Sequence, residues 1–341
     1  MSSTAVPKAH KAIAIWLLVL CAMVFVMISL GGVTRLTHSG LSMADWKPLT
    51  RWLPPLTHDG WEHLFALYRK TPEYLKINAH MDLAGFQEIF WLEFIHRLWG
   101  RVIGIVFAIP FVVFLARGWI RGPLVGRIGI VFVLGAAQGA LGWFMVKSGM
   151  VDRPDVSQYR LTAHFAAALL IYGYMFWMAL GLLKPDVPAP VAGMRRWPVV
   201  LLAFVVVTML AGGFVAGTDA GFGYNTYPLM DGQFFPDGLF GLSPWWKSLF
   251  EDTTTIQFDH RLLAETTFVL AMIFVYRAWR RPLAKTQRVA VAHVGVVALI
   301  QVTLGISTLL LVVPVPLAAL HQAGAVVLFT VTLWTVHAFR R

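Results

Sequence analysis

Four of the eleven histidines lie inside apolar stretches of the sequence and recur as two pairs. His96 and His260 are each followed by Arg-Leu, whereas His164 and His321 each lie near the start of a later apolar stretch. Polar groups inside a membrane segment are costly, so they tend to be paired or functional, and imidazole is a common metal ligand. One such histidine alone could equally bond a neighbouring helix, but the repetition favours a metal centre.

The number of ligands indicates which metal centre is expected. Zinc draws on three or four ligands, often including Cys, Asp or Glu, whereas two histidines from facing helices of a bundle suit axial binding of haem. Arg97 and Arg261 directly follow the first histidine of each pair and are candidate partners for the haem propionates. The alternative for both arginines is a side chain that reaches the membrane interface. The other histidines are expected to be ordinary.

The two histidine pairs differ in one neighbouring residue. Glu93 stands three residues before His96, whereas Gln257 stands three residues before His260. Residues three apart share one face of a helix, so a carboxylate is expected beside the first haem and an amide beside the second. A carboxylate can move protons or stabilise a developing cation, and an amide cannot. We therefore assign chemistry to the first half, with an acid that only favours a helix N-terminus as the alternative for Glu93.

The elements that must position these residues are membrane-spanning helices. Of the 341 residues, 58% are hydrophobic and 13% are charged, about half the charged share of a soluble domain. This composition excludes a soluble enzyme. The net charge of +11 comes from Lys and Arg that flank apolar stretches rather than from a basic face, so nucleic acid is not an expected partner and membrane lipid is. The single cysteine, Cys21, has no intrachain partner for a disulfide.

Eight spans of sufficient length can be placed between the charged residues. Six are plain, two of them produced where Pro314 and Pro316 divide the uncharged stretch 289–339; two shorter ones begin with polar residues. The predicted spans are 12–34, 93–115, 128–146, 161–183, 197–218, 260–276 and the two parts of 289–339. The expected fold is an all-α polytopic membrane protein with eight transmembrane helices arranged as two tandem four-helix bundles.

An internal duplication supports the two bundles. Four anchors recur in the same order: the Gly-Gly pair at 31 and 212, His-Arg-Leu at 96 and 260, Gln-x-x-Leu-Gly at 138 and 301, and the histidines at 164 and 321. The expected domains are residues 1–190, with a long outer loop, and residues 191–341. Each half then contributes one histidine from its second helix and one from its fourth.

The distribution of positive charge predicts the orientation. Fifteen Lys and Arg residues fall on the side that carries both termini and ten on the other, so both termini are expected in the cytoplasm. All four histidines then lie at the outer ends of their helices. The short segment before the first span suits neither a transit peptide nor a cleaved signal, which favours the bacterial inner membrane. The outer loop, with Trp46, Trp52 and Trp61, is expected to be a lid on the bilayer surface or a plain connector.

Several segments resemble the haem A synthase family, which converts haem O to haem A. They are Gly31–Thr37 with Ser39–Ser42, Trp46-Lys47-Pro48, Pro54-Pro55, FWLEFIHRLWGR from Phe90 to Arg101, Asn225–Gly232, Gln257–Arg261 and His321–Ala325. The likeness covers essentially the whole chain. EFIHRLWGR together with NTYPLMDG is specific, whereas a lone His-Arg is not.

The resemblance implies a role for each site residue. His96 and His164 would flank the substrate haem O, His260 and His321 would bind a haem b, and Glu93 would be the catalytic acid. The family oxidises a porphyrin methyl to a formyl for terminal oxidase assembly. Implied partners are the haem O synthase, an electron donor such as a ferredoxin or a quinol system, and a possible second copy of the chain. Some members carry a cysteine pair in the outer loops, and this chain lacks it.

Two other functions compete with haem modification. A bis-histidine di-haem electron carrier would place haems near both membrane faces, whereas the four histidines here are expected near one face. A secondary transporter with a histidine proton relay is supported by the repeats alone and would bind no haem.

Overall fold

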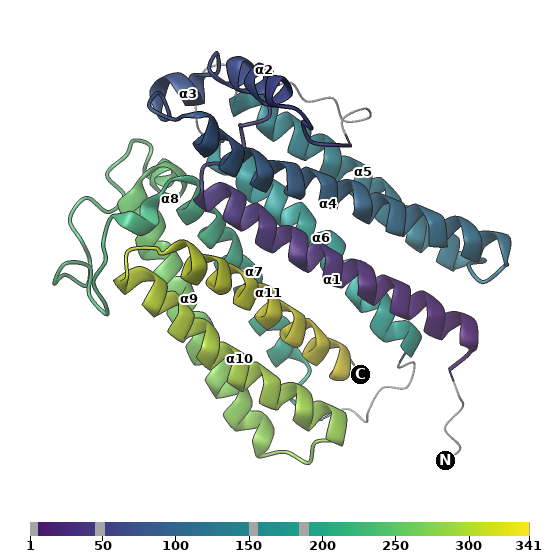
Figure 1. The fold of residues 1–341 in the computed structure, drawn as a ribbon. Helices are drawn as coiled ribbons and strands as arrows, with labels where there is room; N and C mark the ends of the chain where they lie inside the picture. The colour runs from purple at the N-terminus through teal and green to yellow at the C-terminus, as the bar shows by residue number, and fades with distance from the viewer. Residues whose placement is uncertain (1–5, 45–51, 150–155, 184–190, 341) are drawn as a thin grey trace. The chain divides into compact units, whose positions relative to one another are not determined.

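The chain is almost entirely helical in the part that its computed structural model describes, residues 6–44, 52–149, 156–183 and 191–340. Eight of these helices are long and apolar enough to cross a membrane (Figure 1). They are α1 (Lys8–Leu36), α4 (Leu83–Ala116), α5 (Pro123–Gly149), α6 (Gln158–Leu183), α7 (Arg196–Gly217), α9 (Thr253–Trp279), α10 (Lys285–Leu310) and α11 (Val315–Ala338). The predicted all-α polytopic fold with eight spans is confirmed.

Prolines divide the last uncharged stretch as expected. Helix α10 ends at Leu310, and Pro314 is the N-cap of α11, with Pro316 in the first turn of that helix. Proline is tolerated at this position because the first N–H groups of a helix have no intrahelical acceptor. A proline further inside a helix would lack the N–H that bonds the carbonyl four residues earlier, so one continuous helix cannot run through Pro314 and Pro316.

The two helices with polar beginnings start earlier than the predicted spans. Helix α4 begins at Leu83, where the Asp82 side chain accepts a hydrogen bond from the Gly85 N–H at 2.9 Å. Helix α9 begins at Thr253, where Asp252 accepts from the Thr255 N–H at 3.0 Å. Each aspartate satisfies one of the unpaired donors at the helix start. Glu93 and Gln257 therefore lie inside these helices and not in the first turn.

The chain divides into two compact units, which we call the N-terminal unit (residues 22–168) and the C-terminal unit (residues 1–21 and 169–341). In the C-terminal unit α7 contacts α9, α9 contacts α10, α10 contacts α11 and α11 contacts α7, which closes a four-helix bundle. The predicted domain boundary between residues 190 and 191 falls beside residues 184–190, which lie outside the described part of the chain. It stays a prediction, as does the tandem arrangement of two bundles.

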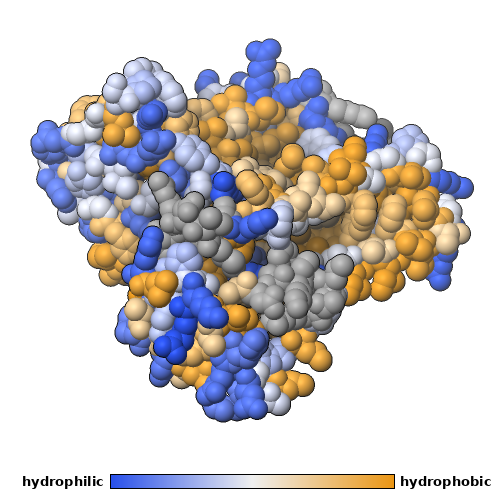
Figure 2. Space-filling view, turned by 90° about the horizontal axis from the view of Figure 1, so that it is seen from above, coloured by the Kyte–Doolittle hydropathy of each residue, from blue (hydrophilic) through white to orange (hydrophobic). Residues whose placement is uncertain are grey.

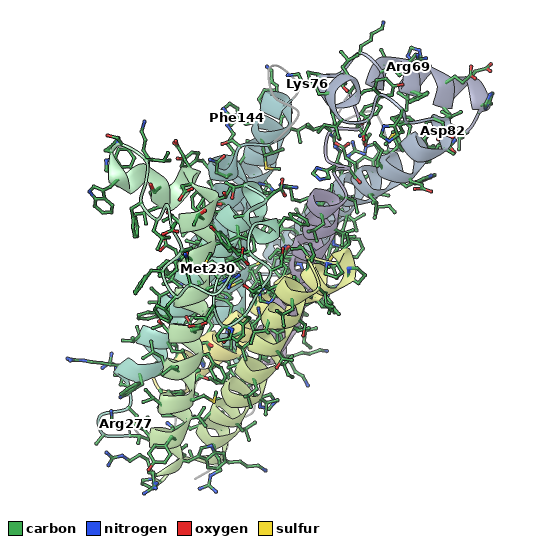
Figure 3. All side chains as sticks on the ribbon, turned by 90° about the vertical axis from the view of Figure 1, so that its left-hand side faces the viewer. Arg69, Lys76, Asp82, Phe144, Met230 and Arg277 are labelled. Carbon is green, nitrogen blue, oxygen red and sulfur yellow. The ribbon has the colours of Figure 1, made fainter. Side chains whose placement is uncertain are left out.

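The outer segment of the N-terminal unit is folded rather than a plain connector. It forms α2 (His58–Tyr68) and α3 (Pro72–Lys76), and Figure 3 shows Arg69, Lys76 and Asp82 in this region. Tyr68 and Phe86 are fully buried there. They belong to an aromatic cluster that joins α2 to the first turns of α4. The outer segment therefore packs on the extra turns at the start of α4.

Hydrophobic side chains cover large areas of the face shown in Figure 2, beside areas of hydrophilic side chains. Ile109, Val133 and Leu170 are each about 60% exposed or more in the middle of predicted spans. At the end of α9, Arg277 lies over the Trp197 ring at 5.1 Å (Figure 3). A cation beside an aromatic ring is typical of a membrane interface.

Candidate functional site

The four repeat histidines occur on four different helices, two in each unit. His96 of α4 and His164 of α6 belong to the N-terminal unit, and His260 of α9 and His321 of α11 belong to the C-terminal unit, as the predicted pairs require. Three of them lie within the first eight residues of α6, α9 and α11. His96 lies deeper in α4 because α4 carries extra turns at its start.

Glu93 is buried and fully engaged by protein groups. Its side chain is 2% exposed; Oε2 accepts hydrogen bonds from the Ser42 hydroxyl at 2.6 Å and from the Met43 N–H at 2.8 Å. Its Oε1 forms an ion pair with Arg97, one turn further along α4. A buried carboxylate needs such partners, because an unpaired charge in the interior is strongly destabilising.

The outer segment covers this carboxylate. Met43, whose backbone N–H binds Glu93, is buried in the same aromatic cluster as Phe90 and Phe94 of α4. Trp61 of α2 packs edge to face on Phe90, with ring centroids 4.9 Å apart. Trp61 is one of the three tryptophans on which the predicted lid rests, and it is part of the packed cover next to Glu93. Trp46 lies outside the described residues.

The equivalent position in the C-terminal unit has the opposite hydrogen-bonding polarity. Gln257 is 2% exposed, and its Nε2 donates to the Tyr224 carbonyl at 3.1 Å. Arg261 donates to the same carbonyl at 2.6 Å and to the Thr226 carbonyl at 2.9 Å. In the C-terminal unit the side chains of α9 thus donate hydrogen bonds to the loop that contains Tyr224. In the N-terminal unit the Glu93 side chain of α4 instead accepts hydrogen bonds from Ser42 and Met43.

Both candidate propionate partners have partners within the protein. Arg97 pairs with Glu93, and Arg261 holds the loop that contains the NTYPLMDG motif. A role toward a propionate requires each guanidinium to bind a second carboxylate or to exchange its present partner. This role stays a prediction for both residues.

The donor set fits haem better than a multi-ligand metal ion. Within the described ranges no group of three or more His, Cys, Asp or Glu side chains converges as a metal-ion site needs. The histidines instead come in pairs, and His164 retains a buried Nδ1 that has no hydrogen-bond partner. Two imidazoles from facing helices are an axial ligand pair for haem.

Sequence reasoning missed three residues that contact the site. Ser42 holds Glu93, while Gln138 and Gln301 reach the histidines of the following helix, His164 and His321. Signals for all three were present: Ser42 ends one of the motif segments, and each glutamine opens a repeated Gln-x-x-Leu-Gly motif. Only the structure shows that these side chains contact Glu93 and the two histidines.

Known proteins resemble this chain over nearly its whole length. Residues 14–333 match the family model COX15-CtaA, described as cytochrome oxidase assembly protein. The heme A synthase of Paramagnetospirillum magneticum is 52% identical over 342 residues, covering 98% of this chain and 95% of that protein. The heme A synthase of Nitrosospira multiformis is 51% identical over 336 residues, covering 97% and 94%. Heme A synthase COX15 of Arabidopsis thaliana is 42% identical over 98% of this chain and 76% of that protein.

Proposed function

The chain belongs to the haem A synthase family of cytochrome oxidase assembly proteins, and from this we propose that it oxidises one porphyrin methyl of haem O to the formyl of haem A. The observation that carries the proposal is that each unit contains two of the repeat histidines, while the buried residue three positions before the first of them is Glu93 in the N-terminal unit and Gln257 in the C-terminal unit. The names of the relatives favour this activity over a di-haem electron carrier.

The two histidine pairs have different tasks in this proposal. His96 and His164 hold the substrate haem O next to Glu93, and His260 and His321 hold a haem b. Haem b, when bound, supplies reversible one-electron transfer. The location of two of the four histidines in each unit supports this division. Four-helix bundles commonly build cofactor sites from side chains on facing helices.

Glu93 is the residue that handles protons. Conversion of a methyl to a formyl adds one oxygen atom and, written with water as its source, releases four protons and four electrons, so an external oxidant such as dioxygen must take up the electrons and a base must accept protons from the reacting carbon and the incoming oxygen. A carboxylate beside that carbon accepts such a proton and stabilises positive charge that develops on the ring. Gln257 can do neither, which confines the chemistry to the first pair.

Arg97 links the binding of haem O to the availability of Glu93 as a proton acceptor. A propionate of haem O that pairs with Arg97 competes with Glu93 for the same guanidinium, which frees Glu93 Oε1 to accept a proton. Ser42 and Met43 still hold Oε2 and so keep the carboxylate in place. Arg261 serves a propionate of haem b in the equivalent position.

The membrane context completes the proposal. The eight spans support a multi-pass protein, which we place in the bacterial inner membrane with both termini in the cytoplasm. Its proposed partners are the haem O synthase that supplies the substrate, an electron donor such as a ferredoxin or quinol system, and a second copy of the chain.

A haem analysis tests the function. The full chain is expressed in cells that make haem O, purified, and its pigments are extracted and separated by chromatography. We expect haem b together with haem A or hydroxylated haem O. A preparation that contains two molecules of haem b and no modified haem would contradict the proposal and support an electron carrier.

A further inference from the structure

Each of the four paired imidazoles lies against a glycine on the preceding spanning helix. His96 faces Gly31 of α1, His164 faces Gly142 of α5, His260 faces Gly212 of α7 and His321 faces Gly305 of α10. These glycines belong to the repeated Gly-Gly and Gln-x-x-Leu-Gly motifs, to which the proposed function assigns no role. The same contact therefore occurs four times, twice in each half of the duplication.

At three of the four contacts a β-carbon on the glycine would press on the imidazole. A β-carbon at Gly305 would lie 2.8 Å from His321 Cε1, and one at Gly142 or Gly212 would lie 3.0 Å from the facing Cε1 atom. At Gly31 the nearest ring atom is 3.5 Å away, an ordinary van der Waals contact. Space is not scarce along these helices in general, because a β-carbon at Gly139 of α5 would meet nothing within 4 Å.

Two glutamines hold the histidines of the fourth helix in each half from a second direction. Gln138 Nε2 donates to the His164 carbonyl at 3.0 Å and lies 3.3 Å from the ring Nε2. Gln301 Nε2 donates to the His321 carbonyl at 3.0 Å and lies 3.1 Å from the ring Nδ1. The carbonyl accepts only, so it fixes the NH₂ group on the histidine side and leaves the Oε1 atoms of both glutamines buried without a hydrogen-bond partner.

We propose that Gly142, Gly212 and Gly305 are seats for the imidazoles and that Gln138 and Gln301 orient two of those rings, so that all five are positioning residues for haem ligation. The inference rests on the proposed function, because it assigns the rings to haem. A ring that rests on helix backbone and is held at one nitrogen has few orientations left. Residues that orient metal-binding histidines typically contribute about 10- to 100-fold to metal affinity.

Alanine substitutions test the seats one unit at a time. Gly142→Ala and Gly305→Ala are compared with Gly139→Ala, three residues before Gly142 on the same helix, and with Gly31→Ala, where a methyl fits. Each full-length variant is assayed for haem content by type, for haem loss to apomyoglobin and for its low-spin electron paramagnetic resonance signals. We expect about 10- to 100-fold weaker haem binding for the two seat variants and wild-type values for the two controls.

The effect should be confined to one pair. Gly142→Ala should weaken the substrate haem and leave haem b intact, and Gly305→Ala should do the reverse, a pattern that general misfolding would not produce. For a seat variant that does not fold, Gln138→Leu or Gln301→Leu carries the test, with a shifted low-spin signal and a shifted midpoint potential expected for the haem of the same unit only.

The outcomes separate this inference from the proposed function. Wild-type haem content and spectra in Gly305→Ala and Gln301→Leu would overturn the positioning role while leaving the function standing. A wild-type protein that binds no haem would overturn the function itself. Equal loss of both haems in every variant, Gly139→Ala included, would also overturn the seats.

Discussion

Replacing Glu93 with glutamine removes the proposed proton acceptor but leaves the rest of the site unchanged. The change keeps the size and shape of the side chain and makes the first half resemble the second, where Gln257 occupies the equivalent position. A positioned general base contributes about 100- to 10,000-fold to a rate. We therefore expect haem A formation to fall by about that factor while both haems stay bound, since no histidine is altered.

The same substitution has a cost in stability that follows from the burial of the ion pair. The side chains of Arg97 and Glu93 are 11% and 2% exposed, so Glu93→Gln takes a carboxylate partner from a buried guanidinium. Removing one member of such a pair costs about 3–5 kcal/mol, whereas removing both is often nearly neutral. Glu93→Gln with Arg97→Gln should accordingly unfold closer to the wild type than Glu93→Gln alone.

Ser42→Ala measures how much the outer segment contributes to holding Glu93. It removes one donor to Glu93, worth about 1.5–3 kcal/mol for a charged acceptor, and keeps the carboxylate and its bond to Met43. Haem A formation is measured by pigment chromatography, and stability by thermal unfolding of the purified proteins. Activity of Glu93→Gln within a few-fold of the wild type would refute the assignment of Glu93 as the proton acceptor.

Three further substitutions test other features. Gln257→Glu sets a carboxylate against the Tyr224 carbonyl and should lower the unfolding temperature without creating a second reactive haem, checked by thermal unfolding and pigment analysis. Cys21→Ala should keep full haem A formation in the presence of a thiol oxidant, because the buried Cys21 is the single cysteine of the chain. Trp61→Ala removes ring pairs with Phe90 and Phe86, worth about 0.5–1.5 kcal/mol each, and should speed limited proteolysis of the outer segment; an unchanged cleavage rate would contradict a packed cover.

The eight spans were predictable because they depend on apolar length along the chain, and the four repeat histidines could be singled out because they depend on repetition. Apolar length identifies a membrane helix, and the duplication relates His96 to His260 and His164 to His321 without any coordinates. The early start of α4 was not predictable from apolar length, because its first turns carry polar residues and pack on the outer segment instead of lipid.

Contacts between distant segments explain the remaining differences. Ser42 and Glu93 are 51 residues apart, and nothing in their spacing indicates that a hydroxyl meets a carboxylate. The glycine seats were visible as repeated motifs, but a glycine in a membrane helix has many uses, and only the distance from Gly305 to His321 identifies this one.

The polarity of the loop contacts gives the exchange of Glu for Gln a structural meaning in addition to the chemical one. In the N-terminal unit a hydroxyl and an N–H point at residue 93, so an acceptor is required there; in the C-terminal unit a carbonyl faces residue 257, so a donor is required. Glutamate at both positions would set a carboxylate against the Tyr224 carbonyl, whereas the oxygen and the nitrogen of a glutamine can serve either loop. The two loops therefore accommodate a carboxylate in one half and an amide in the other, and we expect this difference to confine proton transfer to the first histidine pair.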